Sequence, residues 1–197
     1  MKKDADTTLP IHELIRGRWS PRAFEPRSLE RETLELLFEA ARWAASCFNE
    51  QPWRFLTARR DDPAGFELLL STLGESNRRW AANAGALVIG VAKESFTRND
   101  KPNRHARYDL GQAVATLALQ AQSIGVVLHQ MAGFDPQKVR ALSEVPEGYE
   151  PLVAIALGYP AEPTSLPDDL QERERAPRTR KPQTDFVFGA HFSRAAE

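Results

Sequence analysis

An unbroken apolar run at residues 85–92 constrains the fold of this chain more than any other stretch. The run is of strand length, is rich in valine and isoleucine, and contains no polar residue. A strand with one face in water would alternate apolar and polar side chains, which this run does not do. We therefore predict a central strand that is buried on both faces of its sheet.

The rest of the chain shows helix and strand patterns on both sides of this run. Three- and four-residue spacing of apolar side chains predicts helices, and capping residues such as Ser28, Asp62 and Asp135 mark where several begin. We predict helices at residues 9–17 after a Thr8 cap, 28–45, 62–73, 77–83, 107–124 and after Asp135. Further predicted strands lie at residues 53–59, 126–131 and 152–157.

Composition changes after residue 160. Residues 161–182 are rich in proline and charge, so we do not expect them to fold alone. The apolar triplet Phe186-Val187-Phe188 follows and predicts a short strand. A tail that wraps a partner surface and adds an edge strand there would explain both features.

Length and charge limit the classes of function. At 197 residues with 42% hydrophobic content, the chain can bury one full core. The 26 Lys and Arg residues nearly balance 27 Asp and Glu residues, which argues against a general nucleic-acid or membrane-surface binder. Cys47 is the single cysteine, the four histidines lack metal-ligand spacing, and no apolar signal segment opens the sequence. We expect a cytoplasmic protein without a metal site.

The segment Arg18-Trp19-Ser20-Pro21-Arg22 is the strongest candidate for a binding motif. Two guanidinium groups four residues apart, with a hydroxyl between them and a proline that keeps Ser20 extended, can present paired donors to one anionic group. This is the chemistry of a phosphate clamp. Taken alone, the segment is interpreted more readily as a basic surface turn that covers buried aromatic residues, and it is the rest of the chain that favours the clamp.

Five motifs, which follow one another in a fixed order along the chain, support the interpretation of this segment as a phosphate clamp. They are the clamp, the turn at residues 46–53, Asn77, Gly133-Phe134-Asp135 and the tail Arg178-Thr179-Arg180. With these motifs the chain resembles the FMN-dependent nitroreductase family over nearly its whole length, from about Leu9 to Phe188. The resemblance implies an α+β fold, a three-layer sandwich whose mostly antiparallel sheet is flanked by helices. It also implies a homodimer with an exchanged C-terminal tail, in which residues 1–160 form the flavin-binding core and residues 161–197 wrap the partner subunit.

The resemblance assigns cofactor contacts by position. Arg18, Trp19 and Ser20 match the flavin phosphate ligands, and Arg22 and Asn77 match residues at the pyrimidine edge of the ring. A further set matches segments that reach the cofactor from the dimer interface, line one side of the ring, or close on the phosphate from the tail: Ser46, Cys47 and Asn49; Gln130, Met131, Ala132 and Gly133; Arg178 and Arg180. Taken alone, Arg178 and Arg180 would be read as solvated tail charges.

Two aromatic residues are candidates for a wall that faces the substrate, Phe48 and Trp80, although both could equally be packing residues. Three positions depart from the usual family residues. Trp80 stands where some members have lysine, Ala45 where many have proline, and Ala132 where many have glutamate. The departures at Trp80 and Ala132 bear on the substrate range more than on the cofactor.

The function implied by the resemblance is an NAD(P)H-dependent flavin oxidoreductase. It would take hydride from NADH or NADPH onto FMN and then reduce a nitroaromatic, quinone or similar planar acceptor by a ping-pong mechanism. Because the cofactor carries this chemistry, we predict no catalytic side chain. Two alternatives are a flavin storage or delivery protein and a non-catalytic dimeric binding module.

Overall fold

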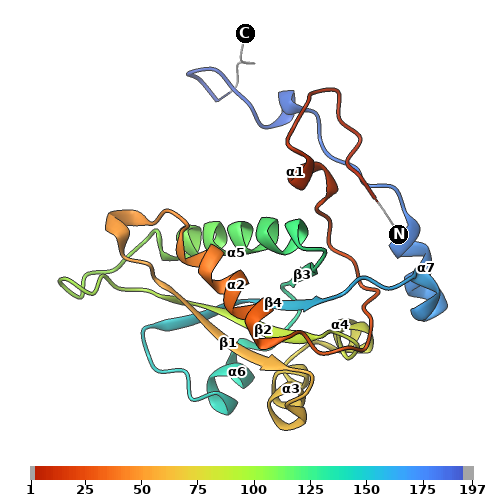
Figure 1. Cartoon of the computed structure of the whole chain (residues 1–197). Coiled ribbons are helices and arrows are strands. Elements are labelled where there is room, and N and C mark those ends of the chain that lie inside the picture. The colour runs from red at the N-terminus through yellow and green to blue at the C-terminus, as the bar shows by residue number, and fades with distance from the viewer. Residues whose placement is uncertain (1–2, 193–197) are drawn as a thin grey trace.

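A four-stranded antiparallel sheet forms the centre of the protein in a computed structural model that describes residues 3–192. The strand order is β1-β2-β4-β3, so β2 and β4 are central and β1 and β3 are edges (Figure 1). The strands are β1 (Trp53–Arg59), β2 (Ala86–Lys93), β3 (Val127–Met131) and β4 (Tyr149–Gly158). Every neighbouring pair in this order is antiparallel.

Helices cover both faces of the sheet and complete three layers (Figure 1). One face is covered by α2 (Arg31–Arg42) and α5 (Ala106–Ser123). The other face is covered by α3 (Pro63–Ser71), α4 (Glu75–Ala81) and α6 (Pro136–Leu142). The short α1 (Glu13–Gly17) and α7 (Asp168–Arg175) belong to the two ends of the chain. This arrangement confirms the predicted α+β sandwich.

Strand β2 explains why both faces need a cover. Its successive side chains alternate between two apolar clusters, with Val88 in the cluster under α2 and α5 and Leu87 and Ile89 in the cluster under α3 and α4. Neighbouring β4 alternates in the same way. The prediction of a central strand buried on both faces is therefore confirmed.

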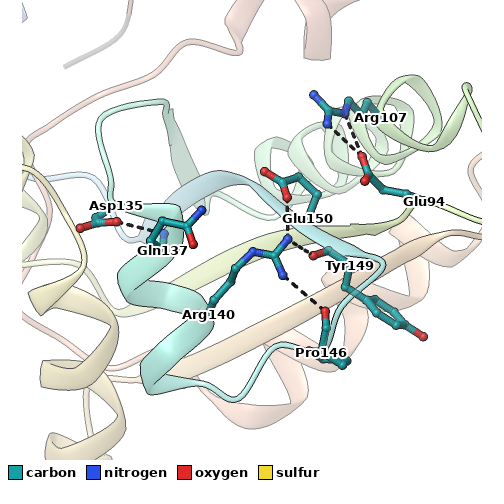
Figure 2. Close-up of polar contacts among 8 residues, drawn as sticks. All are labelled: Glu94, Arg107, Asp135, Gln137, Arg140, Pro146, Tyr149 and Glu150. Carbon is teal, nitrogen blue, oxygen red and sulfur yellow. Dashed lines mark hydrogen bonds and ion pairs between the residues drawn. The ribbon is translucent and has the colours of Figure 1, made fainter.

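The observed helix caps agree with two of the predicted helix starts and differ from two others. Asp62 accepts a hydrogen bond from the Gly65 N–H, and Asp135 accepts from Gln137 and Lys138, so both predicted caps are confirmed (Figure 2). The predicted Thr8 cap is wrong, because α1 begins at Glu13 and His12 caps it. The predicted Ser28 cap is also wrong, because α2 begins at Arg31 and the Ser28 hydroxyl donates to the Leu29 carbonyl.

One arginine closes the loop between α6 and β4. The Arg140 guanidinium donates to the backbone carbonyls of Pro146 and Tyr149 and pairs with the Glu150 carboxylate at 2.6 Å (Figure 2). These contacts fix the entry into β4, and the neighbouring Arg107–Glu94 pair lies at the end of β2. Both arginine contacts therefore support the sheet and not the predicted site.

The tail folds further than its composition predicts. Residues 168–175 form helix α7. Leu170 of this helix and Leu166, which precedes it, are buried in the core under α3 and α4. Arg79 of α4 forms a bidentate ion pair with Asp169. The segment is therefore folded against the core of its own chain, which agrees with the expectation that residues 161–182 do not fold alone.

The last described residues do not join the sheet of this chain. Residues 183–185 form a short 3-10 turn, and the Phe186 and Val187 side chains are 59% and 41% exposed. Pairing of this segment with a partner subunit stays a prediction. Among residues 3–192, no helix is both long enough and apolar enough to cross a membrane.

Candidate flavin-binding site

The predicted clamp, residues 18–22, is an extended segment that lies beside edge strand β3. It contains no helix, and just after it Phe24 forms an isolated β-bridge with Pro160, which follows the end of β4. Its backbone is held by three side chains from distant parts of the sequence: His129, Glu174 and Arg178.

His129 of β3 holds the clamp from the sheet side. Its Nδ1 lies 2.9 Å from the Pro21 carbonyl oxygen, and because a carbonyl only accepts, Nδ1 carries the proton. The imidazole packs against the Trp80 ring at 4.6 Å between centroids. Burial lowers the pKa of His129 to about 4, despite the opposing hydrogen bond to Pro21, so the side chain is neutral at pH 7.

Glu174 of α7 holds the clamp from the tail side. Its Oε1 accepts hydrogen bonds from the backbone N–H groups of Arg22 at 2.8 Å and Ala23 at 3.1 Å. The other oxygen, Oε2, lies 3.9 Å from Arg22 Nη1. The tail helix therefore fixes the end of the clamp directly.

Three guanidinium groups gather at the beginning of the clamp. The Arg18 guanidinium lies beside the Ser20 hydroxyl at 3.4 Å, as the clamp prediction requires. Burial and the charges of Arg178 and Arg180 lower the pKa of Arg18, and burial and Arg180 lower the pKa of Arg178. Within residues 3–192, none of the three forms an ion pair with a carboxylate. The Asp4 carboxylate acts against the lowering of the Arg178 pKa, so it offsets part of the charge, and the described part of this cluster carries a net positive charge.

Arg178 also ties the two ends of the chain together. Its guanidinium donates to the backbone carbonyls of Lys3, Arg16 and Arg18, at 2.7 to 2.9 Å. These contacts occupy three of the five N–H donors of the group. Arg180 is exposed, and its one hydrogen bond to another described residue is to the Thr179 carbonyl. Arg180 is thus freer than Arg178 to meet an anion.

A cavity of about 900 Å³ opens at this cluster. Its polar lining includes Arg18, Arg178 and Arg180, and its apolar lining includes Ile15 and Phe186. Three predicted phosphate ligands, Arg18 near the beginning of the chain and Arg178 and Arg180 in the tail, therefore line one cavity, whereas Trp19 and Ser20 are not among its lining residues.

Asn77 and Gly133, which are predicted to lie at the ring, are in direct contact. Asn77 Nδ2 donates to the Gly133 carbonyl at 3.0 Å, and the Gly74 N–H donates to the same oxygen at 2.9 Å. A Cβ atom at residue 133 would lie 2.7 Å from Asn77 Nδ2, so glycine at this position allows the Asn77 side chain to approach closely. Since Gly133 follows β3, this pair and the clamp lie along the same edge of the sheet.

The segment that contains Ser46, Cys47 and Asn49 lies at the opposite edge, ahead of β1 (Figure 1). The Ser46 hydroxyl accepts from the Gln51 N–H, and the Cys47 N–H donates to the buried Asp109 carboxylate of α5 at 3.0 Å. Phe48, Asn49 and Gln51 all have positive φ, a conformation that non-glycine residues rarely adopt. A single chain does not bring this segment to the clamp.

Two side chains differ from the sequence predictions. Trp80 is 1% exposed and stacks on Phe24, so it cannot form a wall facing the substrate; its ring is large enough to fill the core behind the clamp. Met131 is buried in the same core cluster, so its side chain is also unavailable to a cofactor, whereas Gln130, Ala132 and Gly133 are exposed. Phe48 is 71% exposed and packs edge-on against Phe96, so it remains a candidate wall residue.

The clamp residues fit the terminal phosphate of FMN. A net positive cluster of guanidinium groups beside a serine hydroxyl is suited to a dianionic phosphate. The Asn77 amide and the exposed residue Gly133 lie further along the same sheet edge. Their polar groups are of the kind that form hydrogen bonds with the polar edge of a flavin ring.

Two supporting residues were missed at the sequence level. Glu174 continues the four-residue spacing of Leu166 and Leu170, so a carboxylate on an otherwise apolar helix face was the available signal. Asp109 likewise lies on the buried face of α5 beside Leu110. A charged residue at an apolar position indicates a buried partner, but the sequence does not tell which one.

Comparison with known proteins gives consistent matches. The model of the nitroreductase family matches residues 15–69 and 61–159. A crystal structure of an oxidoreductase containing FMN superposes with a TM-score of 0.90 at 33% sequence identity, covering 96% of this chain and 96% of that chain.

Two curated relatives show how varied the similar proteins are. The 5,6-dimethylbenzimidazole synthase of Rhodospirillum rubrum is 26% identical over 186 residues, covering 80% of this chain and 85% of the relative. The major NAD(P)H-flavin oxidoreductase of Aliivibrio fischeri is 25% identical over 194 residues, covering 77% of this chain and 88% of the relative. Because the two names describe different reactions, these similarities do not assign a reaction to this chain.

Proposed function

Because this chain belongs to the nitroreductase family, we propose that it is an FMN-dependent oxidoreductase that uses NADH or NADPH to reduce nitroaromatics, quinones or similar planar acceptors. The observation that carries this proposal is the cluster of Arg18, Arg178 and Arg180, which has no carboxylate partner among residues 3–192. Such a net positive cluster favours an anionic ligand, because an anion would stabilise the neighbouring guanidinium charges.

Each part of the site has a separate task. Arg18, Ser20 and Arg180 would bind the phosphate, and Arg22 and Asn77 would orient the ring from its pyrimidine edge. The FMN, when bound, would supply the hydride chemistry, so the protein need only position the reactants. The exposed Gly133 backbone permits an acceptor or a ring to approach closely.

We propose further that the working protein is a homodimer. Ser46, Cys47 and Asn49 lie at the sheet edge opposite the clamp, so a second copy is needed if they are to reach a flavin held there. Apolar side chains remain exposed on α1, α2 and the tail: Ile15, Leu36, Trp43, Phe186 and Val187. Residues 161–197 would then act as an extension that packs first on its own core and then on the partner.

Binding of riboflavin and FMN tests the phosphate clamp. The two molecules share the ring and differ in the phosphate, so the wild-type protein should bind FMN much more tightly than riboflavin. Replacing Arg180 by alanine removes charge-assisted hydrogen bonds worth about 1.5–3 kcal/mol and should weaken FMN binding about 10- to 100-fold. Riboflavin binding should not change, as measured by quenching of flavin fluorescence.

A matched control is Arg175→Ala, because Arg175 is an exposed arginine of the same tail whose hydrogen bond is to Gln171. This variant should bind FMN like the wild type. Equal affinity of the wild type for FMN and riboflavin would contradict the clamp.

Turnover distinguishes the enzyme from its alternatives. NADH or NADPH should bleach the bound flavin, a quinone or nitroaromatic should restore the colour, and initial rates should follow ping-pong kinetics. Bound FMN that neither nicotinamide reduces would favour a storage or delivery protein. Failure to bind FMN at all would favour a non-catalytic binding module.

A further inference from the structure

Glu174 is a fully buried carboxylate that belongs to the tail and not to the core. Its side chain is 1% exposed, and it is one of two acidic residues that are buried among residues 3–192. An ionised carboxylate is costly to bury unless hydrogen-bond donors surround it. The groups that contact Glu174 must therefore offset the cost of burying its charge.

The contacts of Glu174 are concentrated on the predicted clamp. One oxygen receives both the Arg22 and the Ala23 backbone N–H groups, from residues 152 and 151 positions earlier in the chain. The second oxygen receives no hydrogen bond from the part of the chain that the structure describes, and it lies 3.9 Å from Arg22 Nη1. Glu174 therefore sets the position of the Arg22 backbone and provides the nearest counter-charge to its guanidinium.

The helix that carries Glu174 is itself well anchored. Leu170 is buried one turn earlier, and Asp169 pairs with Arg79 of α4. The Lys3 ammonium donates to the Glu174 carbonyl, at 2.7 Å, and its position over the Trp19 ring links this helix to the middle of the clamp. A displacement of α7 would thus be transmitted to residues 18–23.

We propose that Glu174 is a positioning residue for the cofactor clamp, which acts by holding the Arg22 and Ala23 N–H groups so that Arg18, Ser20 and Arg22 face the same ligand. This inference rests on the proposed FMN function. It makes the tail helix part of the cofactor site even though α7 itself need not touch the cofactor.

Two variants of Glu174 test separately whether the length of the side chain or its charge is needed to hold the clamp. Glu174→Asp keeps the charge but shortens the side chain by one methylene, so the carboxylate no longer reaches both N–H groups. Glu174→Gln keeps the length and an acceptor oxygen but removes the charge. The control is Glu172→Asp, which makes the same change at an exposed position of the same helix.

Two measurements are made on the full-length protein. Hydrogen exchange of the Arg22 and Ala23 amides, without added FMN, should be at least tenfold faster in Glu174→Asp than in the wild type. FMN affinity should fall about 10- to 100-fold in Glu174→Asp. Glu174→Gln and Glu172→Asp should stay within about threefold of the wild type in both measurements, since the positioning contact is retained.

Unchanged amide exchange and FMN affinity in Glu174→Asp would overturn the positioning role. An equal loss in Glu174→Gln would also overturn it, because charge and not reach would then be decisive. Failure of the wild-type protein to bind FMN is a separate result that overturns the proposed function before any variant is compared.

Discussion

The low pKa of His129 predicts a specific loss of stability in acid. The folded-state pKa is about 4, whereas an unfolded histidine has its ordinary value of 6.5. Between these two pH values, the unfolded chain binds a proton that the folded chain does not, so the free energy of unfolding falls as the pH falls. Above pH 6.5 the histidine is neutral in both states and contributes no pH dependence.

The size of the effect follows from the two pKa values. Their difference is about 2.5, and at about 1.36 kcal/mol per pKa unit this corresponds to roughly 3 kcal/mol. Most of it should be lost by about pH 4.5, where the unfolded histidine is nearly fully protonated. This is a large part of the stability of a typical domain, which is about 5–15 kcal/mol.

The assay compares urea unfolding of the wild type and His129→Gln at pH 7 and at about pH 4.5. Glutamine does not titrate, and its amide can still donate to the Pro21 carbonyl. All other titratable groups are common to both proteins, so their contributions cancel in the comparison. The wild type should lose about 2–3 kcal/mol more than the variant.

Two results would refute this reasoning. The first is an equal loss of unfolding free energy in the wild type and in His129→Gln. The second is an NMR titration that places the pKa of the folded-state imidazole near its ordinary value, which would mean that burial beside Trp80 does not disfavour its charge.

Three further predictions concern single positions and the tail. Asp62→Ala removes the cap of α3 and should lower the free energy of unfolding by about 1 kcal/mol, measured by urea titration. Gly133→Ala should weaken FMN binding with little change in melting temperature, because the new methyl group displaces the flexible Asn77 side chain; equal FMN affinity would contradict the contact. Truncation after Leu170 should lower both FMN retention and dimer stability in sedimentation experiments, since it removes Glu174 and Arg178; a dimer that binds FMN normally would show that the tail is dispensable.

The sequence predicts the sandwich well because local patterns decide it. The run at residues 85–92 has the length and the apolar character of a strand with two covered faces, and it becomes β2. Asp62 and Asp135 each stand before a proline, and this local pairing locates the starts of α3 and α6. Thr8 failed as a cap because side-chain type alone does not say whether the next residues turn into a helix.

The site is predicted less completely because its contacts are long-range. Arg18 and Ser20 are close in sequence, and the structure brings them together as expected. The sequence leaves Trp80 open between a pocket wall and the core because its residue type fits both, and the packed Phe24 ring decides for the core. Helix α7 was missed because its mean composition is polar, although Leu170 and Glu174 share one buried face.

The long-range support of the clamp has a consequence for biosynthesis. Residues 18–23 leave the ribosome early, but their partners His129, Glu174 and Arg178 are made much later. The clamp backbone therefore lacks these hydrogen-bond partners until residue 178 has been translated. A chain that ends before this residue cannot form the full set of contacts. Any ligand that needs the assembled clamp would consequently be bound only after Arg178 has been synthesised.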